Sequence, residues 1–319
     1  MSIHTSTRWA MRSVPPLSQG CAALRRFSVQ HACRSASEAT APSVAASFLS
    51  RFQSMGPQTR SQVLDANQLQ LLSLTLNRPS LYPNSPSLSN ASGVVPTGTP
   101  LPPAYHLVYF TPAFLEGELG ADGTDVSYNP EAPFTRRMWA GGEVQWPRGA
   151  DGKPNPLRVG QEVQETTRVL SAEPKIIRKT GDEMIVVSVE KEFRNEHGVA
   201  VIDRRQTAVT LFRFSALTFN PHKIHYSTPW ARDVEGHKDI VVHGPLNLIS
   251  ILDLWRDTRA DSATDSSLLL PESISYRATS PLYAEETYRI VLDEERGDSV
   301  SRVQIFTPDE KVAMKADIR

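Results

Sequence analysis

The hydrophobic pattern of the second half of the chain is that of two antiparallel sheets. Residues 157–213 carry short runs rich in β-branched side chains, which predict a meander of about four strands. A similar set of runs closes the chain. The expected turns of the meander lie at 173–174, 181–182 and 195–198, and the closing strands at 273–280, 284–293, 299–307 and 311–318.

Two helices are predicted beside these sheets. Residues 245–256 are apolar almost all round and begin with Pro245, which is favourable at the first position of a helix, so this helix should be buried. An earlier helix should begin at Asp65, whose side chain can cap it, and should end before Pro79. Its apolar face consists of Leu69, Leu72 and Leu76.

An antiparallel sheet wrapped around one buried helix is a small α+β arrangement, and here the strand-rich texture occurs twice. The central helix is clear only in the second copy. A first central helix would have to lie before residue 157, where the many turn residues do not let it be placed. Residues 80–103 are dense in Pro, Ser, Asn and Gly, which predicts a weakly ordered linker or wrapping loop.

Composition and charge narrow the classes of function. The 319 residues are 39% apolar and carry a net charge of −1, which is too balanced for a general nucleic-acid binder. No apolar run reaches the roughly 18 residues that a membrane-spanning helix needs. The sequence therefore predicts a soluble globular protein that neither binds nucleic acid nor inserts into a membrane.

The first 37 residues differ from the rest of the chain in charge. Five arginines precede the first acidic residue, Glu38, and they are interleaved with Ser, Ala and apolar residues. This composition is typical of a mitochondrial transit peptide, and the alternative is an unrelated basic tail. We expect residues 1–37 to direct the protein to the mitochondrial matrix. Because Cys21 and Cys33 fall in this segment, the rest of the chain has no disulfide, thiolate metal site or cysteine nucleophile.

Four histidines gather beside the start of the predicted buried helix. A lone histidine is most often structural, whereas four at a strand-to-helix junction indicate a functional site. A metal site would need a carboxylate from what should be a solvated connection, so we expect no metal. The histidines are His222, His225, His237 and His243, and the nearby carboxylates are Asp233, Glu235 and Asp239.

The residues around these histidines resemble the hydratase motif of the MaoC-like hot-dog hydratase and dehydratase family. That motif reads T-G-D-x-N-P-(I or L)-H, and a His-Gly pair follows it at the start of the central helix. Thr218, Ile224, His225 and the pair His243-Gly244 coincide with it. A branch that reads L-T-F-N-x-H-(R or K)-I-H-Y matches from 217 to 226 throughout. The branch includes mitochondrial 3-hydroxyacyl-thioester dehydratases of type II fatty-acid synthesis and hydratases of C5-dicarboxylic acyl-CoAs.

The resemblance implies a tandem, or double, hot-dog of the α+β class, in which antiparallel sheets wrap around a buried central helix. Residues 1–37 would be the transit peptide and residues 38–103 an N-terminal helix and linker. A non-catalytic hot-dog that shapes the pocket would occupy residues 104–213. The copy that carries the hydratase motif would occupy residues 214–319.

The chain also departs from the family pattern. Asn220 stands where the general motif has Asp, and His222 stands where it has Asn. Many members of the close branch have Asp at the position of Ser227. The motif therefore provides one clear proton-transfer group, His225, and leaves the second unassigned.

Dehydration of a 3-hydroxyacyl thioester requires a base for the α-proton, an acid for the departing hydroxyl, and a donor for the thioester oxygen. His225 suits proton transfer because an imidazole titrates near the working pH, and Asn220 can position the water. Gly244, at the helix start, should donate its N–H to the thioester oxygen. The substrate contacts are expected from His222, His243, Tyr226 and Arg277.

The sequence thus predicts a hydro-lyase that needs no cofactor of its own and acts on a thioester carried by the phosphopantetheine of acyl carrier protein or coenzyme A. A homodimer is left open. The preferred interpretation is a mitochondrial 3-hydroxyacyl-thioester dehydratase. The first alternative is a mesaconyl- or itaconyl-type C5-dicarboxylyl-CoA hydratase, in which Arg277 would bind the distal carboxylate. The second, motivated by Asn220 and Ser227, is an inactive thioester-binding protein.

Overall fold

The computed structural model describes most of the chain after its first 39 residues. All described residues belong to one compact unit, residues 39–319. The predicted transit peptide, both cysteines and Asn220 lie outside the described part. The described residues are 40–82, 85–89, 95–134, 140–149, 151–176, 181, 183–206, 212–218, 222–259, 269–293 and 300–319.

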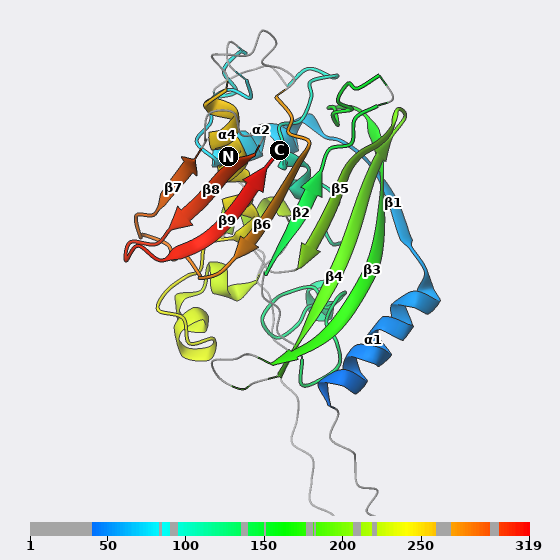
Figure 1. Cartoon of the computed structure of the whole chain (residues 1–319), viewed down its shortest axis with the longest axis vertical. Helices are drawn as coiled ribbons and strands as arrows, with labels where there is room; N and C mark the ends of the chain where they lie inside the picture. Colours follow the sequence, from blue (N-terminus) through cyan, green and yellow to red (C-terminus); the bar gives the residue numbers. More distant parts are fainter. Residues whose placement is uncertain are drawn as a thin grey trace, which may run out of the picture. The chain divides into compact units, whose positions relative to one another are not determined.

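Within this part, nine strands form one antiparallel sheet in the order β1-β3-β4-β5-β2-β6-β9-β8-β7 (Figure 1). The strands from the two halves of the chain meet where β2 pairs with β6, with Val144 opposite Ile274. The sheet is thus continuous across the predicted division at residue 213, and that division stays a prediction. The strands are β1 (Gln58–Val63), β2 (Gly141–Gln145), β3 (Glu162–Ile176), β4 (Glu183–Asn195), β5 (Gly198–Gln206), β6 (Ser273–Ala278), β7 (Arg289–Asp293), β8 (Ser301–Phe306) and β9 (Val312–Ile318).

The four closing strands lie within their predicted ranges, whereas the described part of the meander has three strands instead of four. The turn expected at Glu173-Pro174 is wrong, because β3 runs through both residues as one strand paired with β4. On its other side, β3 pairs with β1 only from Glu162 to Thr167. Pro174 therefore lies beyond the part of that edge that β1 covers, where a proline is better tolerated. The turn expected at 195–198 separates β4 from β5. The turn expected at 181–182 falls between β3 and β4, and Asp182 lies outside the described residues.

Both predicted helices are present. The helix α4 (Gly244–Asp257) is buried along most of its length, as its apolar composition predicts. The helix α2 (Ala66–Thr75) begins after Asp65, whose Oδ1 accepts a hydrogen bond from the Gln68 N–H at 2.7 Å. Leu69 and Leu72 of α2 lie in the same hydrophobic core as α4, and Figure 1 shows both helices on one side of the sheet. The helix α2, which the sequence predicts without assigning it to a hot-dog copy, is therefore the candidate for the central helix of the first copy.

Two elements near the start of the described part were not predicted. The helix α1 (Ala41–Met55) packs Phe48 against Val187 and Val189 of β4, although most of its other side chains are small or polar. The edge strand β1 is mostly exposed and polar, and its backbone pairing with β3 holds it in the sheet. Both precede residue 104, so the range expected to hold only a helix and a linker also contributes to the sheet.

The described parts of the expected linker are packed against the core. Leu81, Leu88, Val95 and Leu101 are buried there, each at most 8% exposed. Short helical elements complete this part of the chain: α3 (Phe212–Thr218), η1 (Tyr105–Val108), η2 (Glu116–Glu118), η3 (Lys223–His225) and η4 (Trp230–Val234). None of the described helices has both the length and the apolar character needed to cross a membrane.

Candidate active site

Three of the four clustered histidines meet at the N-terminal end of α4. His225 ends η3, His222 directly precedes η3, and His243 is the N-cap residue of α4. The rings of His225 and His243 stack with their centroids 4.3 Å apart and their planes 12° from parallel. The His222 ring meets the His225 ring edge-on at 5.4 Å. All three side chains are buried.

The hydrogen bond of His225 fixes which ring nitrogen carries a proton. Nδ1 lies 2.6 Å from the carbonyl oxygen of Val241, and because a carbonyl can only accept, Nδ1 donates. In the neutral ring Nε2 then carries the lone pair, and this buried atom has no hydrogen-bond partner in the described part of the protein. The neutral tautomer therefore presents an unoccupied proton acceptor.

Burial keeps this ring neutral. Removal from water lowers the pKa of His225 well below its usual value, and the nearby His222 and His237 act in the same direction against the opposing hydrogen bond to Val241. Burial likewise lowers the pKa of His243, helped by His225 and His222. The stacked pair is thus two neutral imidazoles at neutral pH.

The start of α4 can bind a negatively charged oxygen beside these rings. The first N–H groups of a helix have no partner within the helix, and the helix dipole favours negative charge there. Pro245 has no N–H, so the donors at the first residues are Gly244 and Leu246. Gly244 is the first residue of α4 and follows its N-cap residue, His243.

Asp122 is a residue of the cluster that the sequence reasoning missed. Its Oδ2 lies 3.5 Å from Nε2 of His222, and the side chain is buried. It belongs to a glycine-bounded turn in which the N–H of Gly120 donates to the Thr124 carbonyl at 2.7 Å. The available signal was an acidic residue between Gly120 and Gly123, in a segment interpreted only as a loop packed over apolar residues.

Asn247 is a second residue that the sequence reasoning did not single out. It lies in the first turn of α4, is 7% exposed, and its N–H donates to the His243 carbonyl at 2.9 Å. Its side-chain Oδ1 is buried and has no hydrogen-bond partner among the described residues. The first turn of α4 therefore carries one buried amide next to its histidine cap.

The remaining predicted site residues lie at the edge of the cluster or away from it. Tyr226 follows η3 and is 38% exposed. The hydroxyl of Ser227 accepts a hydrogen bond from the Trp230 N–H at 3.4 Å, which gives this position a local role at the start of η4. His237 packs against Tyr283, with 3.5 Å between Nδ1 and the hydroxyl.

Arg277 is not brought to the histidines. It is exposed on β6, whereas its neighbours Ile274 and Tyr276 are buried in the core, so its side chain lies on the opposite face of the sheet. The predicted contact of Arg277 with substrate is therefore not supported by its position. The described residues contain no group of three His, Cys, Asp or Glu arranged to hold a metal ion.

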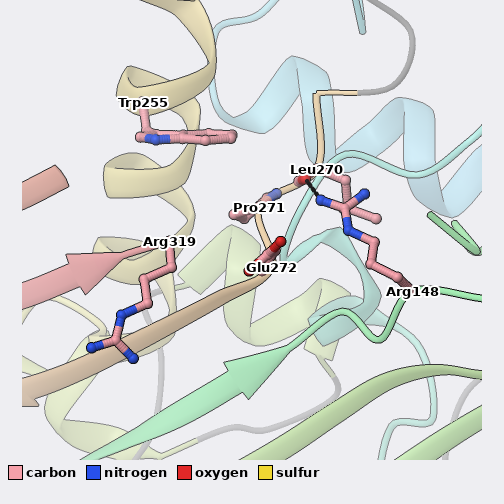
Figure 2. Close-up of a pocket in the computed structure, with 6 residues that line it drawn as sticks. All are labelled: Arg148, Trp255, Leu270, Pro271, Glu272 and Arg319. Atoms are coloured by element: carbon pink, nitrogen blue, oxygen red, sulfur yellow. Dashed lines mark hydrogen bonds between the residues drawn. The ribbon is translucent and has the colours of Figure 1, made fainter. Parts of the chain in front are cut away.

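A pocket of about 370 Å³ lies at the other end of α4, as Figure 2 shows. It is lined by Arg148, Trp255, Leu270, Pro271, Glu272 and Arg319. One nitrogen of Arg148 is already hydrogen-bonded there, because its Nη2 donates to the Leu270 carbonyl at 2.9 Å. Trp255 and Gly244 are separated by about 16 Å of helix at the usual rise per residue. None of the predicted site residues lines this pocket.

Comparison with known sequences gives a family and two characterised relatives. The family model described as hydroxyacyl-thioester dehydratase type 2 matches residues 104–210 and 204–284. The chain is 28% identical over 267 residues to mesaconyl-C(4)-CoA hydratase of Chloroflexus aurantiacus, covering 73% of this chain and 88% of that protein. It is 25% identical over 248 residues to the mitochondrial hydroxyacyl-thioester dehydratase type 2 of Schizosaccharomyces pombe, covering 61% and 79%.

Solved structures support the fold. A MaoC-like dehydratase from Phytophthora capsici superposes with a TM-score of 0.52 at 12% identity, over 82% of this chain and 94% of the other. A Mycobacterium tuberculosis protein described as a double hot-dog superposes with a TM-score of 0.50 at 10% identity, over 84% and 96%. The predicted tandem hot-dog fold is thereby confirmed.

Proposed function

Because the chain belongs to the hydroxyacyl-thioester dehydratase type 2 family, we propose that it is a mitochondrial 3-hydroxyacyl-thioester dehydratase of type II fatty-acid synthesis. Hydratase or dehydratase chemistry is what the family and both relatives share, so the chain is a hydro-lyase of the MaoC-like hot-dog family. The physiological acyl chain, the carrier and the pathway are the part that we propose.

The observation that carries the chemistry is the state of His225. A neutral imidazole whose Nδ1 is held by the Val241 carbonyl, and whose Nε2 has no partner in the described part, is arranged to accept a proton. In the dehydration direction, Nε2 takes the α-proton at C2 of the 3-hydroxyacyl thioester. The reverse transfer returns the proton to C2 when the enoyl thioester is hydrated.

The second requirement is a donor for the thioester oxygen, which becomes negatively charged as C2 loses its proton. Gly244 supplies a backbone N–H at the start of α4, beside the stacked rings of His225 and His243. A fixed N–H in a dry site stabilises such an oxyanion without reorganising when the charge appears. His225 and Gly244 thus divide proton transfer and charge stabilisation between them.

The decisive experiment compares the purified wild-type protein with His225→Gln, using crotonyl-CoA and following the loss of enoyl absorbance. The variant should lower kcat by about 10²- to 10⁴-fold, the usual contribution of a general base. His197→Gln is the matched control, because this histidine is 69% exposed on the surface. Full activity in His225→Gln would contradict the proposed chemistry, and a wild-type protein that binds thioesters without turnover would favour the inactive binding protein.

A dicarboxylyl-CoA hydratase remains the second candidate, because the Chloroflexus relative is a mesaconyl-C(4)-CoA hydratase that covers 73% of this chain. Mesaconyl-C(4)-CoA and crotonyl-CoA should therefore be tested side by side, together with the corresponding acyl carrier protein thioester. A kcat/KM for mesaconyl-CoA at least tenfold above that for both linear thioesters would decide for the second candidate.

The mitochondrial part of the proposal rests on residues 1–37 and on the mitochondrial relative from Schizosaccharomyces pombe. Fusion of residues 1–37 to a fluorescent protein should direct the fusion to mitochondria. A fusion in which the five arginines of this segment are replaced by glutamine is the matched control, and it should stay outside. Equal distribution of both fusions would contradict the matrix assignment.

A further inference from the structure

The position of Asp122 bears on the acid–base group that the motif leaves unassigned. Burying a carboxylate is costly unless its oxygens find partners. Oδ1 accepts two hydrogen bonds from Thr124, from the N–H at 3.0 Å and from the hydroxyl at 2.8 Å. Oδ2 makes no hydrogen bond in the described part and faces Nε2 of His222 at 3.5 Å. One oxygen therefore holds the turn, and the other faces an imidazole.

Two hydrogen bonds from Lys223, one from its backbone and one from its side chain, fix this approach. The Lys223 N–H donates to the Asp122 carbonyl at 2.9 Å, and the Lys223 ammonium donates to the Ala121 carbonyl at 2.7 Å. Lys223 is the first residue of η3, which also carries His225. The Asp122 turn and the histidine turn are thus joined directly, so the approach of Asp122 to His222 does not depend on the side chains alone.

The hydratase motif of this chain lacks a carboxylate that the general motif has. The general motif has Asp where this chain has Asn220, and an amide can position a water but cannot exchange a proton. Dehydration still needs an acid for the departing hydroxyl. Among the described residues, the titratable groups near His222 include Asp122 on the turn, His225 on η3 and His243 at the α4 cap. Asp122 is the carboxylic acid among these three.

We propose that Asp122 is the positioning residue for His222, and that the two together supply the acid that the missing motif carboxylate would have provided. This inference rests on the proposed function. The charge of a carboxylate 3.5 Å from Nε2 favours a proton on that nitrogen and stabilises the doubly protonated imidazolium of His222. Nδ1 is then the nitrogen of His222 that exchanges a proton with the substrate.

The two histidines return to their starting protonation states over one turnover. His222, protonated on both nitrogens, gives its Nδ1 proton to the 3-hydroxyl, the C3–O bond breaks and water leaves. Neutral His225 takes the C2 proton at Nε2, and the electron pair of that bond forms the C2–C3 double bond. The cycle ends with His222 neutral and His225 protonated. Transfer of one proton from His225 to His222, whose ring centroids are 5.4 Å apart, restores the starting state.

The test uses two substrates that differ only in the leaving group. Hydroxide needs a proton to depart from 3-hydroxybutyryl-CoA, whereas chloride leaves 3-chlorobutyryl-CoA without one. Asp122→Asn keeps an oxygen for Thr124 and removes the charge. It should lower kcat for 3-hydroxybutyryl-CoA by about 10²- to 10³-fold, with KM changed less than threefold, and leave chloride elimination within about threefold of wild type. His225→Gln should impair both substrates.

Asp151→Asn is the matched control, because Asp151 also accepts a hydrogen bond from the N–H two residues on, at 3.0 Å, in an exposed turn. It should not change either rate. In Asp122→Asn, the alkaline limb of the kcat profile for 3-hydroxybutyryl-CoA should move to lower pH, because the acid loses its protonated form more easily.

Each outcome decides the question. Loss of both eliminations in Asp122→Asn would assign the residue a purely structural role and overturn the inference, and so would retention of both. Loss of hydroxide elimination alone supports it. A wild-type protein that processes no thioester would overturn the proposed function itself, and the inference with it. Because His225→Gln is measured on the same substrates, failure of the function and failure of the Asp122 role are distinguishable.

Discussion

The two ends of α4 each bury a group of polar side chains, and the two groups are built on different principles. At the N-terminal end, neutral rings of His225 and His243 stack, and Nε2 of His225 has no partner in the described part. At the C-terminal end, opposite charges are paired. Asp253 Oδ1 lies 3.0 Å from Nη2 of Arg256, which is 1% exposed.

The C-terminal group also ties α4 to other elements. The hydroxyl of Tyr105, on η1, donates to Asp253 at 3.2 Å, and burial raises the pKa of Tyr105, so the phenol stays protonated. Arg78, just after α2, contacts Asp253 at 3.6 Å and pairs with Asp257. The guanidinium of Arg256 lies over the Tyr105 ring, 5.8 Å from its centroid. This group therefore joins η1 and the end of α2 to the C-terminal end of α4.

The difference indicates that one end of α4 contributes mainly to stability and the other end mainly to catalysis. The buried carboxylate of Asp253 has cationic and hydroxyl partners, although Nη1 and Nη2 of Arg256 make no hydrogen bond among the described residues. Loss of this carboxylate leaves the buried cations without their counter-charge. A buried imidazole without a partner for Nε2 is not compensated, which costs stability but leaves a lone pair for a substrate proton. The N-terminal end should therefore respond to substitution mainly in turnover, and the C-terminal end mainly in folding.

The largest expected effect comes from breaking the C-terminal group. Asp253→Ala leaves Arg256 buried without its carboxylate and should lower the free energy of unfolding by about 3–5 kcal/mol. Urea denaturation measures this loss, and kcat per folded molecule should stay within twofold of wild type. Asp257→Ala is the control, because its side chain is 53% exposed and the loss should be under about 1 kcal/mol. A large fall in kcat of folded Asp253→Ala would contradict the separation of the two ends.

The same contrast appears in what the sequence could predict of the fold. The positions of α4 and of the four closing strands can be predicted from apolar runs, because the side chains that they bury are apolar. β1 is polar and is held by backbone pairing with β3, so no side-chain pattern marks it. The expected turn at Pro174 failed because a proline is tolerated on the part of β3 that β1 does not cover.

The candidate site divides in a similar way. His222, His225, His243 and Gly244 are close in sequence, and the motif predicts their meeting. Asp122 comes from the other half of the chain, and the hydrogen bonds from Lys223 to the carbonyls of Asp122 and Ala121 bring its turn to His222. Arg277 was chosen for its charge, but the alternation of side chains along β6 turns it away from the core. Local motifs can be predicted from sequence, whereas contacts across the tandem repeat cannot.

A smaller effect should appear in the pH dependence of stability, and it belongs to the N-terminal end. Burial lowers the pKa of His225, so below about pH 6.5 the unfolded ring takes a proton that the folded ring does not. Stability therefore falls as the pH falls, by about 1.4 kcal/mol per pH unit for each such ring. His225→Gln should remove that share of the slope between pH 6.5 and 5, measured by urea denaturation.

His197→Gln is the control for this measurement, because its exposed ring lies outside the cluster, and it should keep the wild-type slope. A slope in His225→Gln equal to that of wild type would show that the folded His225 ring takes its proton as readily as the unfolded one. That result would remove the reason for treating His225 as a neutral base at neutral pH.

The smallest effect is expected from Arg277→Ala, which tests whether charge alone could have identified a substrate contact. Arg277 and its cross-strand partner Lys315 are both exposed, while the residues that alternate with Arg277 on β6 are buried. Removing either cation should leave kcat/KM for crotonyl-CoA and mesaconyl-CoA within twofold of wild type, because neither side chain reaches the histidines through the sheet. If Arg277→Ala, but not Lys315→Ala, selectively abolished mesaconyl-CoA turnover, the substrate would have to approach from the outer face. The active site could then no longer be assigned to the N-terminal end of α4.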